Sequence, residues 1–105
     1  MRLNEMTAVV TGGASGMGES MVYALAKEGA SIVVVDRNID GANAVATNVE
    51  KEGGKAICVK ADVQSTEDLD AMADKAMDTF GQVNILVNNA GARVIKGFLE
   101  HTKED

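Results

Sequence analysis

The residue types and spacing that point most directly to chemistry lie in one glycine-rich segment, Thr11–Gly18, which reads TGGASGMG. It follows a short apolar run, Met6–Val10, and precedes a helix-like stretch, Glu19–Glu28. A glycine-rich turn between a strand and a helix lets the backbone approach a phosphate group, and it aims the unpaired N–H groups of the helix N-terminus at that anion. The segment therefore predicts a phosphate-binding turn.

The three spaced glycines of this turn can be given separate roles. Gly12, Gly16 and Gly18 form a G-x-x-x-G-x-G spacing, which departs from the common G-x-G-x-x-G. Gly12 would permit a tight exit from the strand, Gly16 would let a pyrophosphate approach the backbone, and Gly18 would let the helix pack close to the strand. The alternative is an ordinary strand–helix link with flexible glycines, because glycine motifs also arise without ligands.

An acidic residue, Asp36, follows the second apolar run and lies 18 residues after Gly18. A carboxylate there can accept hydrogen bonds from the hydroxyls of an adenosine ribose, and it would repel a 2′-phosphate. Its neighbour Arg37 could offset that repulsion or stack on the adenine. The alternative is that Asp36 and Arg37 form a solvated turn pair. We favour the ribose role because the glycine turn lies upstream.

Alternating strands and helices are expected to position these residues. The pattern predicts strands over 6–11, 31–35, 55–60 and 83–88, and helices over 17–28, over 40–52 and from about 65. The unbroken run Ile32–Val35 suits a parallel strand covered on both faces. Strict alternation with short links implies βαβ units, a parallel sheet and one α/β domain without an internal boundary.

The second and third helices carry clear apolar faces. The residues of these faces are Ala42, Val45, Ala46 and Val49 in the second helix, and Leu69, Met72, Ala73, Ala76, Met77 and Phe80 in the third. Ser65 is expected to cap the third helix, with Asp68 completing an acidic form of the capping box. Gly29, Gly53 and Gly81 are placed to end the three helices.

Composition excludes several function classes. The chain has 105 residues and a formal net charge of -6 with scattered acidic residues, which argues against nucleic acid as a partner. No apolar run approaches the ~20 residues needed to cross a bilayer, so no membrane partner is expected. The single cysteine, Cys58, is expected to be a buried small residue rather than a nucleophile. With His101, the one histidine, it makes no metal site. This cysteine usage fits a cytoplasmic protein.

Four segments together resemble the short-chain dehydrogenase/reductase family. They are Thr11–Gly18, Asp36, Asp62–Val63 and Asn88–Gly91, and they occur in the right order after the right elements. Each motif is modest alone, but the resemblance spans nearly the whole chain. The expected fold is therefore α/β: a Rossmann-like doubly wound parallel sheet, incomplete, with four strands and three helices in the strand order 3-2-1-4.

The resemblance implies a set of cofactor-binding residues around the carboxyl ends of the strands. By this resemblance Ser15–Gly18 would line the pyrophosphate, Asp62–Val63 would meet the adenine amino group, and Asn89–Gly91 would line the adenosine side of the cleft. The residues expected to bind the cofactor are Gly12, Ser15, Gly16, Met17, Gly18, Asp36, Arg37, Asp62, Val63, Asn89, Ala90 and Gly91. From the residues alone, Asp62 and Asn88–Gly91 have no unique meaning, although both follow strands at the edge where parallel sheets bind ligands.

The cofactor expected is NAD, with NADP the less favoured alternative. Family members that use NADP often carry a basic residue where this chain has Ser15, and Asp36 adds to the preference for NAD. The family's catalytic Ser, Tyr and Lys, and a helper Asn, lie beyond the fourth strand. The one Y-x-x-x-K string here, Tyr23–Lys27, lies in the helix after the glycine turn, so no catalytic residue is expected.

The resemblance implies an NAD(P)-dependent oxidoreductase that transfers hydride between the cofactor and an alcohol or carbonyl. The final residues, Thr102–Asp105, look like the start of a helix, so we expect the cofactor-binding half of a longer enzyme, inactive by itself. The alternative is a non-catalytic nucleotide-binding or interaction module from a truncated paralogue. The expected partners are a dinucleotide and, in the full-length form, a small alcohol or carbonyl substrate. A homo-oligomer is among the expected alternatives. A flavodoxin-like domain is disfavoured by the glycine turn and Asp36.

Overall fold

The structure is a computed structural model that describes residues 3–62 and 64–89. Several sequence-based expectations therefore fall outside the described residues. They concern Val63, Ala90, Gly91, His101 and the helix start at Thr102. The remaining expected site residues all lie in the described part of the chain.

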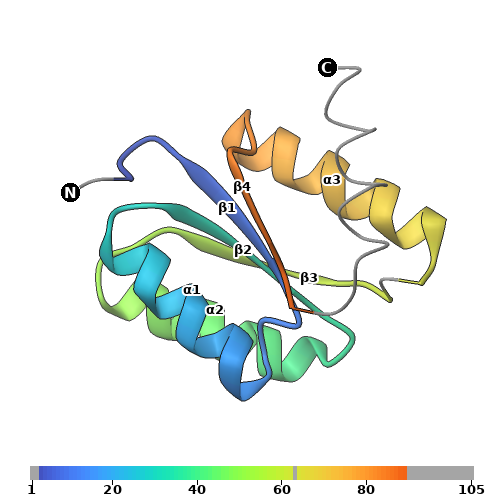
Figure 1. Ribbon diagram of the computed structural model, residues 1–105, viewed down its shortest axis with the longest axis horizontal. Helices are drawn as coiled ribbons and strands as arrows, with labels where there is room; N and C mark the ends of the chain where they lie inside the picture. Colours follow the sequence, from blue (N-terminus) through green and yellow to red (C-terminus); the bar gives the residue numbers. More distant parts are fainter. Residues whose placement is uncertain (1–2, 63, 90–105) are drawn as a thin grey trace.

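Strands and helices alternate along the chain. The elements are β1 (Thr7–Thr11), α1 (Gly16–Lys27), β2 (Ser31–Asp36), α2 (Ile39–Lys51), β3 (Ala56–Lys60), α3 (Thr66–Phe80) and β4 (Ile85–Asn88). The strands pair in parallel in the order β3-β2-β1-β4. Helices α1 and α2 cover one face of the sheet and α3 lies on the other (Figure 1). This confirms the expected Rossmann-like α/β fold and its strand order.

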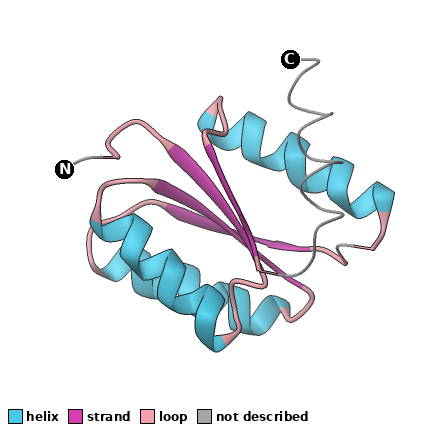
Figure 2. Ribbon diagram, in the orientation of Figure 1, coloured by secondary structure: helices cyan, strands magenta, loops and turns pink. Residues whose placement is uncertain are grey.

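The central strand β2 is buried on both faces, as its unbroken apolar run predicts. Ile32 and Val34 belong to the core under α1 and α2, whereas Val33 and Val35 belong to the core under α3. All four side chains are fully buried. Figure 2 shows the strands as one layer between the helices. This alternation of side chains between two apolar cores is what a parallel sheet with helices on both faces requires.

The expected helix faces and ends are largely confirmed. In α2 the four expected apolar residues are buried, and in α3 Met72, Ala73 and Ala76 are buried while Met77 is only half-buried. Ser65 caps α3, because its hydroxyl oxygen accepts from the Asp68 N–H at 3.2 Å. The other half of the expected capping box does not form, since the Asp68 carboxylate bonds to another residue. Glycines with positive φ follow all three helices.

Some expected boundaries are wrong by one or two residues. Strand β1 begins at Thr7, because Met6 is exposed and lies outside the ladder. Strand β4 begins at Ile85 rather than at residue 83. Asn84 accounts for this, because its backbone N–H and its side-chain oxygen both bond to the backbone of Thr7, at 2.9 Å each. The regular ladder starts only at the next pair, Ala8 with Ile85.

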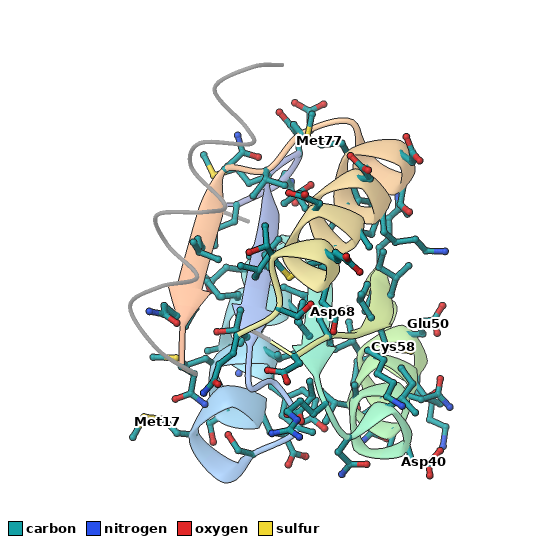
Figure 3. The ribbon with its side chains drawn as sticks, turned by 90° about the vertical axis from the view of Figure 1, so that its right-hand side faces the viewer. Met17, Asp40, Glu50, Cys58, Asp68 and Met77 are labelled. Carbon is teal, nitrogen blue, oxygen red and sulfur yellow. The ribbon has the colours of Figure 1, made fainter. Side chains whose placement is uncertain are left out.

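Three further observations concern the side chains and helices of residues 3–62 and 64–89. Cys58 is half-buried on β3 rather than buried, with its Sγ 3.8 Å from the Asn43 Oδ1 (Figure 3). Within the same residues, none of the helices is long and apolar enough to cross a bilayer. That part of the chain also holds no group of three His, Cys, Asp or Glu side chains able to bind a metal ion.

Candidate functional site

The glycine turn between β1 and α1 has three different kinds of glycine position. Gly12 adopts a left-handed conformation with φ of 66°, which turns the chain sharply out of β1. A Cβ atom at Gly18 would lie 2.1 Å from the carbonyl oxygen of Gly12, so only glycine allows the helix to approach the turn this closely. A Cβ atom at Gly16 would meet nothing within 4 Å. The Gly16 backbone therefore faces open space, as an approaching ligand would require.

The first turn of α1 presents unpaired backbone donors beside this open position. The first hydrogen bond inside the helix runs from the Glu19 N–H to the Ser15 carbonyl at 2.7 Å. Helix geometry therefore leaves the N–H groups of residues 16–18 without an acceptor inside the helix. The Ser15 hydroxyl does not cap them, because it donates to the Gly12 carbonyl at 2.7 Å. Met17 is 69% exposed and extends away from the body of the molecule (Figure 3). This end of α1 is suited to bind an anion.

The Asp36 carboxylate reaches back to the glycine turn. Its Oδ2 accepts a hydrogen bond from the Ala14 N–H at 3.0 Å, and its Oδ1 accepts one from the Asn38 N–H at 3.0 Å. A carboxylate has about four lone-pair sites, so these two amides leave room for further donors. Asp36 is half-exposed and Arg37 beside it is exposed. The turn and the carboxylate thus share one rim of the sheet.

Asp62 lies next along the same rim, two residues beyond the end of β3. The Ala61 N–H donates to the Asp36 carbonyl at 3.2 Å, which holds the end of β3 beside the end of β2. The Asp62 N–H donates to the Asp68 Oδ2 at 2.8 Å, and its Oδ1 accepts from the Gln64 N–H at 2.9 Å. The backbone and one oxygen of Asp62 are therefore fixed by neighbouring groups.

Asn89 joins the end of β4 to the glycine turn. Its side-chain nitrogen donates to the Gly12 carbonyl at 3.2 Å and to the Ser15 hydroxyl at 2.9 Å. Its backbone N–H donates to the hydroxyl oxygen of Thr11 at 3.1 Å. These contacts bring Asn89 together with two other expected site residues, although the sequence separates them by more than 70 positions. The three hydrogen bonds hold the turn against the sheet.

Three supporting residues were not predicted from the sequence. Thr11 is fully buried, and its hydroxyl both donates to the Val87 carbonyl at 3.3 Å and accepts from the backbone after β4. Gly13 is buried as well. A Cβ atom there would lie 2.7 Å from a methyl group of Val34, so the position has no room for a side chain. Asp68 supports Asp62. The sequence marked Asp68 only as part of a capping box, and Thr11 and Gly13 only as members of the glycine-rich segment. Neither signal specifies these partners.

Tyr23 lies in α1, and its hydroxyl faces α2 rather than the glycine turn. It lines a groove of about 1340 Å³ together with Lys27 and the starts of β2 and β3. Its hydroxyl donates to the Glu19 carboxylate at 2.8 Å and accepts from the Asn48 side chain at 2.9 Å. Burial raises the pKa of Tyr23, and Glu19 raises it further while Asn48 lowers it. A general base at neutral pH needs a shift in the other direction.

The chain resembles the same kind of protein in sequence and in structure. The family described as short chain dehydrogenase matches residues 6–105. The 7alpha-hydroxysteroid dehydrogenase of Escherichia coli (strain K12) is 41% identical over 98 residues, which are 93% of this chain and 38% of that protein. The chain therefore spans about two fifths of that relative's length.

Two solved structures share the arrangement of elements. A 7 alpha-hydroxysteroid dehydrogenase complexed with NADH and 7-oxo glycochenodeoxycholic acid superposes with a TM-score of 0.83 at 42% identity, covering 87% of this chain and 36% of that one. A metagenomic short-chain oxidoreductase in complex with NADP gives a TM-score of 0.90 at 23% identity, covering 99% of this chain and 57% of that one. At that lower identity the second structure supports the fold alone.

Proposed function

The chain belongs to the short-chain dehydrogenase family, and from this premise we propose that it is the cofactor-binding part of an NAD-dependent oxidoreductase acting on CH–OH groups. When bound, the nicotinamide dinucleotide supplies the hydride chemistry, and the protein contributes binding and orientation. The relative that this chain resembles is more than twice as long, which supports the proposal that the catalytic residues belong to a further segment. We propose that the protein works in the cytoplasm.

One observation carries this proposal: the Asp36 carboxylate and the open end of α1 lie on the same rim, joined by the hydrogen bond from the Ala14 N–H at 3.0 Å. A pyrophosphate at the amides of residues 16–18 would be favoured by the unpaired donors and by the helix dipole. A ribose attached to it would meet the carboxylate one crossover away. The pyrophosphate would therefore meet hydrogen-bond donors after β1, and the ribose would meet an acceptor after the adjacent strand β2.

The strand order gives the cofactor a direction along the rim. The pyrophosphate would lie at the end of β1, the adenosine ribose at Asp36 after β2, and the adenine at Asp62 after β3. The nicotinamide half would then extend the other way, past Asn89 at the end of β4. This direction follows because β3, β2, β1 and β4 are neighbours in that order, and because parallel sheets bind ligands at the carboxyl ends of their strands.

The preference for NAD over NADP is part of the proposal. A 2′-phosphate would bring about two negative charges against the Asp36 carboxylate. At the turn, position 15 is a serine whose hydroxyl is already hydrogen-bonded to Gly12 and Asn89, so it offers no cation in compensation. Arg37 is exposed and is the nearest residue in the sequence that could reduce the repulsion.

The substrate class proposed is a secondary alcohol and its ketone. The identity of 41% to a 7alpha-hydroxysteroid dehydrogenase supports a cyclic alcohol of the steroid kind. We assign the recognition of that substrate, and the groups that react with it, to the part of the enzyme beyond the described residues.

Titration of the purified protein with NADH and NADPH, followed by the fluorescence of the reduced nicotinamide ring, tests this proposal. Saturable binding of NADH, at least tenfold tighter than binding of NADPH, is expected. Failure of both dinucleotides to bind at millimolar concentration would contradict the cofactor role. The coding sequence that follows Asp105 is a second check: a serine and a Y-x-x-x-K segment are expected there, and their absence would favour a non-catalytic module.

A further inference from the structure

The carboxylate of Asp68 makes an unexpected contact at the start of α3. It occupies the third position of the helix, from which an acidic side chain commonly reaches back to the N-cap residue. Here the N–H of the N-cap, Ser65, donates instead to the Asp62 carbonyl at 2.9 Å. The Asp68 Oδ2 accepts from the Asp62 N–H at 2.8 Å, and both residues are half-buried. Asp68 therefore holds a rim residue rather than its own helix end.

The remaining contacts turn this hydrogen bond into a rigid support. Ser65 fixes the Asp68 backbone through its hydroxyl, at 3.2 Å. Asp62 is held by its N–H, by its carbonyl and by the Gln64 N–H on its Oδ1 at 2.9 Å. Its Oδ2 accepts no hydrogen bond from the described residues. The Asp62 side chain is thus left with one oxygen for a ligand, in an orientation that Asp68 helps to set. Figure 3 shows Asp68 on the first turn of α3.

We propose that Asp68 is a positioning residue that aims the Asp62 carboxylate at the amino group of the adenine ring, and so makes the site specific for adenine. The inference rests on the proposed function, because it needs a dinucleotide whose adenine lies beyond Asp36 on the rim. An ionised carboxylate accepts hydrogen bonds and cannot donate them. An exocyclic amino group at this place is attracted to Asp62, whereas a carbonyl oxygen is repelled.

Nicotinamide hypoxanthine dinucleotide distinguishes positioning from mere stabilisation. It carries a carbonyl oxygen where NAD carries the adenine amino group, and the ring nitrogen beside that carbonyl bears a hydrogen. The sugars, the pyrophosphate and the nicotinamide are the same. The wild-type protein is expected to bind NAD about 10- to 100-fold more tightly than this analogue, the range for a hydrogen bond to a charged group. In Asp68→Ala the ratio is expected to fall below about threefold, mainly through weaker NAD binding.

Three matched variants complete the test. Asp62→Ala is expected to lose the ratio as completely as Asp68→Ala. Asp68→Asn is expected to keep most of it, because the amide oxygen can still accept from the Asp62 N–H. Glu67→Ala removes an exposed acidic side chain from the same helical turn and is expected to change nothing. If Asp68→Ala does not fold, Asp68→Glu retains an acid that helix starts favour while displacing the acceptor oxygen, and it is expected to lower the ratio.

The outcomes separate the inference from the proposed function. An unchanged ratio in Asp68→Ala and Asp68→Glu, or an equal loss of affinity for both dinucleotides, would overturn the positioning role. A wild-type protein that binds both dinucleotides equally would overturn it as well and leave the cofactor role standing. A wild-type protein that binds neither would overturn the proposed function itself.

Discussion

The side-chain nitrogen of Asn89 lies 3.2 Å from the carbonyl oxygen of Gly12, although 77 residues separate the two. The same nitrogen lies 2.9 Å from the Ser15 hydroxyl. At the other end of β4, Asn84 exchanges hydrogen bonds with Thr7 in a comparable way. An asparagine thus ties each end of β4 to β1, but only Asn89 touches the glycine turn. This difference allows the cofactor role of the turn to be separated from general stability.

Replacement of Asn89 by alanine is expected to lower the affinity for NADH as well as the stability. The change removes the side-chain hydrogen bonds to the Gly12 carbonyl, which keeps Ser15 as a donor, and to the Ser15 hydroxyl. Each lost bond costs about 0.5–1.5 kcal/mol, and the turn is freer to move. Asn84→Ala is the matched control, because it breaks a β4–β1 contact at the opposite edge. Thermal unfolding and NADH titration of both variants provide the measurement. Equal NADH affinity in the two variants would show that Asn89 does not organise the turn.

Alanine at Gly18 and alanine at Gly16 are expected to act in different ways. At Gly18 the new Cβ would lie 2.1 Å from a backbone oxygen, so overpacking should destabilise the protein by about 1–3 kcal/mol. At Gly16 the Cβ meets nothing, and stability should change by less than about 1 kcal/mol. Gly16→Ala should instead weaken NADH binding, because the methyl group takes the space of the pyrophosphate. Full NADH affinity in Gly16→Ala would argue against a pyrophosphate at this position.

Removal of the Asp36 carboxylate is expected to reduce the discrimination between the two cofactors. Asp36→Ala removes the acceptor for the ribose hydroxyls and the charge that repels a 2′-phosphate, so NADH affinity should fall about 10- to 100-fold. NADPH affinity should fall less or rise. The NADPH affinity of the variant should stay below the NADH affinity of the wild type, because the Ala14 N–H also loses its acceptor. Binding constants for both cofactors decide the matter, and an unchanged ratio of the two would remove Asp36 from ribose recognition.

Ionisation of Tyr23 is expected above its ordinary pKa of 10.0, because burial and the Glu19 carboxylate both favour the neutral phenol. The folded protein holds this proton more tightly than the unfolded chain does. The contribution of Tyr23 to the free energy of unfolding is therefore constant below pH 10 and decreases as the pH rises further. Tyr23 is the only tyrosine and there is no tryptophan, so phenolate absorbance reports it alone. Glu19→Gln should lower the pKa and Asn48→Ala should raise it. Shifts in the same direction would contradict the hydrogen-bond arrangement.

The fold could be predicted well because its signals are local. The run of four apolar residues in β2 is typical of a strand covered on both faces, and the apolar spacing of α2 matches its buried residues one by one. The strand order followed from resemblance. The start of β4 was less accurate because Asn84 replaces regular ladder pairing with a side-chain bond, and sequence periodicity carries no information about such bonds.

The geometry of the glycine turn was predictable where the backbone itself imposes the residue type. Gly12 needs a left-handed conformation and Gly18 needs the absence of a Cβ, and both requirements leave a mark in the sequence. Thr11 acts through contacts with Val87 and Asn89, which are far away in the sequence. Asp68 was marked only as a capping residue, so its contact with the Asp62 N–H could not be predicted. Cys58 was expected to be buried because its neighbours are apolar, yet the outer strand β3 leaves it half-exposed.

Backbone amide chemical shifts, recorded by NMR as NAD is added to the purified protein, are the most direct test of a pyrophosphate site at the start of α1. We expect the largest, saturable shifts at residues 16–18, where the unpaired donors of α1 would bind the pyrophosphate, followed by Ala14 beside Asp36. Amides at the opposite edge, such as Gly29 and Gly53, serve as internal controls and should stay unchanged. Shifts confined to the opposite edge, or none at residues 16–18 at saturating NAD, would contradict the account.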